Sequence, residues 1–306
     1  MVKLSHRIGV FGVAVATALG LTACADNGSE ADTTHASASE TASAQSGTSQ
    51  TRAADGAVTV TDAAGRTLQF NELPERIVLA EGRAAFATAL LQDEPLHNVV
   101  AYGQDLEKAA GAFRDKLFEL QPEAKDMPTI GMIQKGDVTV ENLLAQKPDV
   151  VIMTLDQKKA VEESGFISDM DAAGLKYAFI DFRQKPLENT TVSMQLLGDL
   201  LGQSERAEKY NEFYNAKVKE ITDRVADTTD RPDVLIWMAA GFNDCCAVAG
   251  DANLGTLVTA AGGHNLGPEV LGADSTTITA EKLIELNPDK LIVTGGEWAR
   301  DPNRTD

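Results

Sequence analysis

The chain has 306 residues, with 27 Lys and Arg against 46 Asp and Glu, for a formal net charge of −19. This length allows two lobes that each bury a core of their own. The negative surface argues against nucleic-acid binding, because it repels phosphate backbones. Three cysteines are too few for a disulfide scaffold or a zinc ribbon.

The N-terminus has the pattern of a secretory signal. Two basic residues precede an apolar run over 8–21, which is short for a membrane span. The run ends in Leu-Thr-Ala-Cys at 21–24, which resembles the bacterial lipobox, where the cysteine is lipidated and becomes the new N-terminus. A plain signal peptide that ends near a cysteine is the alternative. We expect a signal peptide over 1–23, lipidation at Cys24 and a place on the extracytoplasmic face of the cell membrane.

After the cysteine, the composition indicates a tether followed by a folded α/β part. Residues 24–56 are almost all small or polar, which predicts a disordered tether. An alternating pattern over 57–70 predicts a hairpin. Apolar strand patterns then alternate with helical ones, which favours a mostly parallel sheet. The predicted strands are 76–80, 98–102, 149–154 and 177–181, and the predicted helices include 84–91 and 158–173.

One element occurs twice. Residues 139–152 and 279–292 share Thr, Glu, Leu, Pro, Asp and Ile at matching positions. Each copy predicts a helix that is capped by its Thr, carries Glu in its first turn and stops before Pro, followed by a buried strand. The repeat predicts two lobes built on the same plan.

A long helical segment lies between the two copies. It covers about 190–226 and is interrupted at 202–204, with Ser204 as the expected N-cap of its second part. We therefore predict two Rossmann-like α/β lobes joined by a long spine helix. The predicted boundaries are 57–187 for the N-terminal lobe, 188–228 for the spine and 229–306 for the C-terminal lobe.

Taken in order, these motifs resemble one protein family. The lipobox, the tether, the V-T-V-T-D-A-A-G-R-T hairpin, the repeated element and the spine resemble the helical-backbone substrate-binding lipoproteins of ABC importers for ferric siderophores, haem and cobalamin. The resemblance implies a monomer without enzymatic activity. It also implies that the protein captures an iron chelate, a ferric siderophore in our interpretation, and delivers it to a permease dimer with its ATPase.

The resemblance assigns a role to one glutamate in each copy of the repeat. In the family, a Glu at the start of this helix docks into Arg pockets of the permease, which by motif implies Glu141 and Glu281. The alternative is that both only complement a helix dipole. Family members continue past the strand that ends in T-G-G at 294–296, whereas this chain ends at Asp306, so we expect an incomplete C-terminal lobe.

Ligand-binding candidates are the residues at or near strand ends, because open α/β sheets bind ligands beyond the carboxyl ends of their strands. The cations among them are expected to hold an anionic chelate, although each could instead pair with a nearby acid. The aromatic residues are expected to stack on its organic part, although Trp237 could equally pack in the core. The predicted set is Arg83, Tyr102, Met132, Lys135, Arg183, Trp237, Phe242, Asn243 and Trp298.

Two alternative functions remain. A haem-binding protein would need an axial ligand, for which Tyr102, His97 and His264 are the candidates, His264 being more in keeping with a structural role. A metal-cluster oxidoreductase subunit would need several thiolates, and only Cys245 and Cys246 remain after lipidation. We expect these two cysteines to be reduced or separately packed, since adjacent cysteines bridge only under strain. A strained vicinal disulfide and contact with a ligand are the alternatives. We assign no catalytic residue, no resident cofactor and no metal site.

Overall fold

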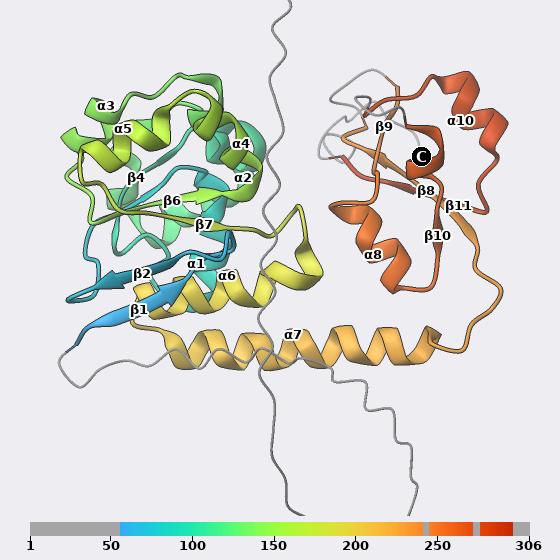
Figure 1. Ribbon diagram of the computed structural model, residues 1–306, viewed down its shortest axis with the longest axis horizontal. Helices are drawn as coiled ribbons and strands as arrows, with labels where there is room; N and C mark the ends of the chain where they lie inside the picture. The colour runs from blue at the N-terminus through green and yellow to red at the C-terminus, as the bar shows by residue number, and fades with distance from the viewer. Residues whose placement is uncertain (1–55, 241–244, 272–275, 296–306) are drawn as a thin grey trace, which may run out of the picture. The chain divides into compact units, whose positions relative to one another are not determined.

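The computed structural model describes residues 56–240, 245–271 and 276–295 (Figure 1). The first lobe opens with the expected antiparallel hairpin of β1 (Val58–Thr61) and β2 (Thr67–Phe70). The buried Asp62 closes its turn, because its carboxylate accepts hydrogen bonds from the backbone N–H groups of Ala64 and Arg66. The hairpin expected over 57–70 is confirmed.

A five-stranded parallel sheet forms the centre of the N-terminal lobe. Its strands are β3 (Ile77–Leu79), β4 (Val99–Gly103), β5 (Thr129–Ile130), β6 (Val150–Thr154) and β7 (Tyr177–Ile180), in the order β5-β4-β3-β6-β7. The chain runs outward from β3 to β5 and then returns to place β6 beside β3. The order of the strands therefore reverses between β3 and β6, and this is the point where such sheets bind ligands.

Helices and short 3₁₀ turns connect these strands. The α-helices are α1 (Ala85–Leu91), α2 (Asp105–Leu120), α3 (Val140–Ala145), α4 (Leu155–Glu163) and α5 (Phe166–Ala172). The 3₁₀ turns are η1 (Gly82–Ala84), η2 (Pro122–Asp126) and η3 (Ile133–Lys135). The single helix predicted over 158–173 is wrong, because Gly165 adopts a left-handed φ of 80° and separates α4 from α5.

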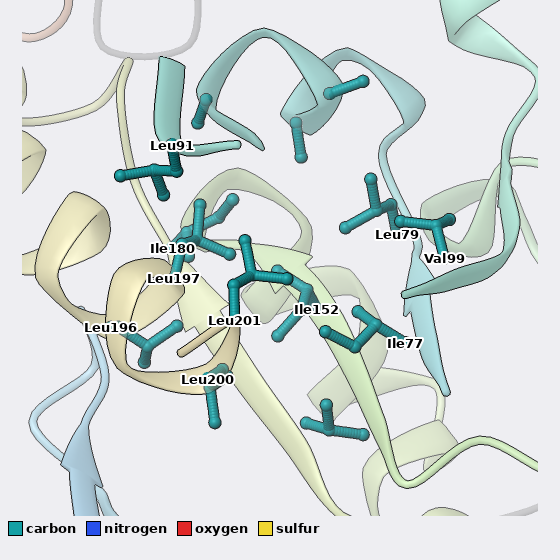
Figure 2. Packing of buried hydrophobic residues seen from close by; sticks show 14 of the residues in the cluster. Ile77, Leu79, Leu91, Val99, Ile152, Ile180, Leu196, Leu197, Leu200 and Leu201 are labelled. Carbon is teal, nitrogen blue, oxygen red and sulfur yellow. The ribbon is translucent and has the colours of Figure 1, made fainter. Parts of the chain in front are cut away.

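Helix α6 (Pro186–Leu200) packs into the core of the N-terminal lobe. Figure 2 shows Leu196, Leu197 and Leu200 from this helix among apolar side chains of the sheet and of α1. Leu197 is fully buried, together with Ile180 of β7 and Leu91 of α1. The first half of the predicted spine is therefore a core helix of the N-terminal lobe.

Helix α7 (Ser204–Val225) is the continuous element that leads out of this lobe. Its 22 residues correspond to a length of about 33 Å. Ser204 is the first helical residue and not the N-cap that we expected, because Gly202 turns the chain with a φ of 67° and Gln203 occupies the cap position. Three hydrogen bonds join α7 to α6. The Tyr214 hydroxyl donates to the Pro186 carbonyl over 2.8 Å. The Asn211 amide donates to the Thr191 carbonyl over 3.0 Å and to Gln195 Oε1 over 3.3 Å.

The C-terminal lobe is a second, smaller α/β unit. Its strands are β8 (Asp233–Met238), β9 (Ala247–Val248), β10 (His264–Asn265) and β11 (Lys290–Val293), and its helices are α8 (Leu254–Ala260), α9 (Gly267–Val270) and α10 (Ala280–Leu286). Strands β10 and β11 lie parallel to β8 on either side of it, and β9 pairs antiparallel with β8.

The two adjacent cysteines differ from expectation. The structure pairs Cys245 with Cys246 as a disulfide, which is the strained alternative to the reduced or separately packed cysteines that we expected. The Cys246 side chain is fully buried against Leu235 and Val248, at the edge of the small core of this lobe.

The repeated sequence element forms the same structure in both lobes. Thr139 and Thr279 cap α3 and α10, each hydroxyl accepting from the backbone N–H three residues later. Asp149 accepts from the backbone N–H of Arg76 just before β3, and Asp289 accepts from that of Asp233 at the start of β8, both over 2.9 Å. The Pro-Asp step thus ties each helix–strand unit to the central strand of its sheet, and the predicted duplication of this element is confirmed. The buried strand expected in the second copy is wrong: β6 is buried, whereas β11 lies at the edge of the described sheet and is exposed along its length.

Replacing Leu197 by Ala tests the packing of α6. We expect the free energy of unfolding to fall by about 2–5 kcal/mol, because the change leaves a cavity in a fully buried site. Leu120→Ala is the matched control, since Leu120 is 61% exposed. Urea denaturation of both variants measures the difference, and equal losses would contradict the described position of α6.

Candidate functional site

Two side chains meet where the strand order reverses. Glu81 lies two residues beyond β3, and Thr154 is the last residue of β6. The Thr154 hydroxyl donates to Glu81 Oε2 over 3.1 Å. The Glu81 residue is only 7% exposed, so its carboxylate needs nearby partners.

Two arginines supply these partners. Arg83 Nη2 lies 2.7 Å from Glu81 Oε1, and its Nε lies 3.1 Å from Asp105 Oδ2. Arg183 Nη2 lies 2.7 Å from Glu81 Oε2 and also pairs with Asp156. Each guanidinium group is thus shared between two carboxylates, and Glu81 joins both halves. We call Glu81, Arg83, Asp105, Asp156 and Arg183 the Glu81 cluster.

Burial and pairing affect the acids of the cluster in opposite directions. Burial raises the pKa of Glu81 above its ordinary value of 4.5, although Arg183 and Arg83 act to lower it. Burial also acts to raise the pKa of Asp156, but hydrogen bonds from Arg183 and Thr154 leave it below the ordinary value. Burial thus disfavours the charged form of Glu81, and the two arginines favour it.

The backbone around the cluster is fixed by two aspartates. Asp105, at the start of α2, accepts from the backbone N–H of Gly82 over 2.7 Å and from that of Arg83 over 3.1 Å. Only glycine fits at position 82, because a Cβ there would lie 2.3 Å from the Gly103 carbonyl oxygen. The buried Asp181 accepts from the backbone N–H groups of Arg183 and Gln184 over 2.8 and 2.7 Å, which holds the loop after β7.

An apolar cavity of about 340 Å³ lies beside the cluster. Its lining adds side chains from three helices to those of the cluster: Phe86, Ala87 and Leu90 from α1, Met194 from α6 and Tyr210 from α7. Phe86 and Leu90 are 46% and 57% exposed, and they lie one helical turn apart on the same wall of the cavity. A smaller hollow of about 80 Å³ adjoins Glu81, Arg83 and Arg183 and is also lined by Met132 and Gln134.

The structure brings three of the predicted ligand-binding residues together. Arg83, Met132 and Arg183 line the same hollow. Lys135 is exposed at the end of η3 and lines neither cavity described here. Arg83 and Arg183 are both already paired with carboxylates of the protein. The structure therefore does not support the expectation that these two arginines bind an anionic ligand.

The predicted aromatic residues are placed differently. Tyr102 lies inside β4, is 3% exposed and packs in the core, so it does not line the cavity. Trp237 is half-buried in β8 and packs against the core of the C-terminal lobe. Phe242, Asn243 and Trp298 lie outside the described residues. Cys24 also lies outside them.

The histidines considered as haem ligands lie at the opposite ends of the strands. His97 precedes β4 and pairs with Glu94 over 3.2 Å. His264 opens β10, with Nδ1 2.7 Å from Asp233 and Nε2 2.8 Å from Glu269. The hydrogen bond to Asp233 is the main cause that raises the pKa of His264 above 6.5. His264 thus bridges two acids of the C-terminal lobe, in keeping with the structural role that we expected for it.

Several residues of the site were missed by the sequence analysis. Asp105 follows a strand by two residues, which is a signal that could have found it. Phe86 and Leu90 belong to a helix with apolar residues on more than one face, which sequence alone does not separate from a buried helix. Tyr210 lines the cavity because α7 packs against α6, and the sequence of α7 does not show this packing.

Glu141 and Glu281 occupy equivalent exposed positions. Each is the second residue of its helix, α3 or α10. The pKa of each carboxyl lies below 4.5, because it accepts hydrogen bonds from its own backbone N–H and from the capping Thr139 or Thr279. Both glutamates are therefore charged at neutral pH and open to a partner.

Comparison with known families gives a match over residues 106–305 to the family described as periplasmic binding protein. Comparison with curated proteins gives no match. Within the described ranges, no helix is long and apolar enough to cross a bilayer.

Solved structures show the same fold. The TroA-like periplasmic binding protein FepB from Veillonella parvula has 26% sequence identity and a TM-score of 0.69, over 80% of this chain and 71% of that chain. A periplasmic haem-binding protein from Pseudomonas aeruginosa has 24% identity and a TM-score of 0.52, over 74% and 76%. The periplasmic haem-binding protein RhuT from Roseiflexus sp. RS-1 has 22% identity and a TM-score of 0.51, over 72% and 76%.

Proposed function

Because this chain belongs to the periplasmic binding protein family, we propose that it captures a ferric siderophore outside the cytoplasm and delivers it to an ABC importer. Members of the family bind solutes for transport and are not enzymes, and the same holds for this chain. The observation that carries the proposal is the apolar cavity beside the Glu81 cluster, at the point where the strand order of the sheet reverses.

The composition of the site suits an iron chelate. A chelate presents an organic shell, which the side chains of Phe86, Leu90 and Met194 can cover. The cluster beside them offers fixed polar atoms that can orient the ligand. A volume of about 340 Å³ in this lobe lies at the lower end of the range for small-molecule sites.

A binding titration tests this function. The purified chain is titrated calorimetrically with a ferric trihydroxamate, a ferric tricatecholate, ferric citrate, haemin and cobalamin, and we expect saturable binding of a ferric siderophore. Leu90→Arg should weaken that binding at least about tenfold, because it places a charged side chain in the apolar wall. Leu120→Arg is the control, since Leu120 is exposed and lies on α2, away from the cavity.

Haem is the second candidate ligand. Tyr210 lines the cavity, and a tyrosine oxygen can ligate haem iron. Saturable binding of haemin alone, with a Soret band that shifts in Tyr210→Phe, would replace the siderophore by haem. Binding of none of the five ligands would contradict the proposed function.

Docking to the permease is proposed for Glu141 and Glu281. Both are charged, exposed and held at the same position of equivalent helices, as two symmetric contacts with a permease dimer require. The double variant Glu141→Arg/Glu281→Arg should lower iron uptake by cells at least about tenfold and leave the Kd for the chelate unchanged. Glu163→Arg, on the exposed end of α4, is the control. Normal uptake by the double variant would show that the two glutamates only complement helix dipoles.

Lipid anchoring at Cys24 is proposed from the lipobox. A lipidated cysteine would hold the protein at the extracytoplasmic face of the membrane, beside its permease. Cells fed a radiolabelled fatty acid should label the wild-type chain and leave Cys24→Ser unlabelled. Equal labelling of both chains would place the anchor elsewhere, and no labelling of either would favour a plain signal peptide.

A further inference from the structure

We propose that the ligand of this site is a ferric chelate whose net charge is zero or positive. This inference rests on the proposed function and narrows its substrate class. The sequence alone suggested the opposite, an anion held by arginines.

The charged side chains that line the two cavities do not favour an anion. They comprise four carboxylates, Glu81, Asp105, Asp156 and Asp181, and two guanidinium groups, Arg83 and Arg183. The described part of this site therefore has an excess of negative charge. A chelate anion that approaches it meets repulsion, which is strengthened by the low-dielectric wall of the cavity.

Neither arginine can bind an anionic ligand without breaking an ion pair within the cluster. Arg83 holds Glu81 and Asp105, and Arg183 holds Glu81 and Asp156. If either turned toward a ligand, the buried Glu81 carboxylate would lose one of its two ionic partners. Removing a partner from a buried charge is strongly destabilising, so the arrangement resists this movement.

Two lysines that lie close in sequence to Asp156 and Arg183 are paired with acids of their own helices or helix starts, and a third lies outside the cavities. Lys158 on α4 pairs with Glu162 over 2.6 Å, and Lys185 before α6 pairs with Glu188 over 3.2 Å. Lys135 is exposed on η3, outside both cavities. No cation of the described residues that line the cavities is thus left to neutralise an anionic ligand.

The apolar wall supports an uncharged or cationic ligand. Phe86 and Leu90 offer a large exposed apolar surface, which an uncharged organic shell would cover. The aromatic rings of Phe86 and Tyr210 line the same cavity as Glu81 and Asp156, so a pendant ammonium group could contact either a ring face or a carboxylate. Among the described residues, no three His, Cys, Asp or Glu side chains are grouped so that they could hold a metal ion. We therefore propose that Glu81, Asp105 and Asp156 face a whole chelate and do not ligate a bare ion.

Three chelates that differ in charge test the inference. In a ferric trihydroxamate, three singly charged ligands balance the iron, so the complex is neutral; an analogue with one free ammonium group is a cation, and a ferric tricatecholate is a triply charged anion. The full-length chain should bind the neutral or the cationic chelate at least about tenfold more tightly than the anion. Because part of the site is exposed, added salt should reduce this preference.

Variants of the cluster identify the cause of the preference. Glu81→Gln keeps the size of the side chain and removes one negative charge between the two arginines. The ratio of the Kd for the tricatecholate anion to the Kd for the neutral chelate should therefore fall about tenfold. Asp156→Asn removes a charge at the more exposed rim and serves if Glu81→Gln fails to fold. Glu163→Gln changes the total charge equally at the exposed end of α4 and should leave the preference unchanged.

The outcomes separate the inference from the function on which it rests. Tightest binding of the tricatecholate anion would overturn the inference and leave the proposed function intact. A preference that the variants of Glu81 and Asp156 share with the Glu163 control would also overturn it, because the cluster would then not be its source. Binding of none of the three chelates would overturn both.

Discussion

The pairing of one buried carboxylate with two arginines determines the arrangement of this site. Glu81 and Arg83 both follow β3, whereas Arg183 follows β7 and Thr154 ends β6. The pairing therefore fixes the loops after β3 and β7 relative to β6. Asp105 and Asp181 hold the backbone on either side of it. The result is a rigid polar edge beside an apolar cavity, a combination suited to holding a small ligand without chemical change.

A second constraint is the duplication of the helix–strand element. In each copy a threonine caps the helix, a left-handed residue ends it, and an aspartate ties the following strand to its neighbour. Lys147 and Asn287 adopt the left-handed conformation at the same step, with φ of 50° and 42°. Because the two copies share the same helix cap, left-handed residue and aspartate contact, Glu141 and Glu281 have equivalent surroundings. A partner with two symmetric binding sites could recognise both.

Much of the fold could be predicted because its patterns are local. The runs of apolar residues predicted strands β3, β4, β6 and β7, and the second copy of the repeat predicted helix α10 and strand β11. The two-residue β5 is too short for a periodic signal, and Gly165 breaks a helix whose pattern looks continuous. The site was harder: Arg83 and Arg183 were identified as cations, but their partners became visible only when the sheet brought Glu81, Asp105 and Asp156 together. Tyr102 appeared to lie at a strand end and is in fact inside β4.

Hydrogen–deuterium exchange with and without a bound chelate tests the central claim most directly, because it locates the ligand without relying on a variant. With a neutral ferric trihydroxamate at saturation, we expect slower exchange of backbone amides at 81–87, 155–158 and 183–185, which adjoin the Glu81 cluster and the cavity. Saturable binding that leaves these three segments unchanged would contradict the assignment of the Glu81 cluster and its cavity as the ligand site.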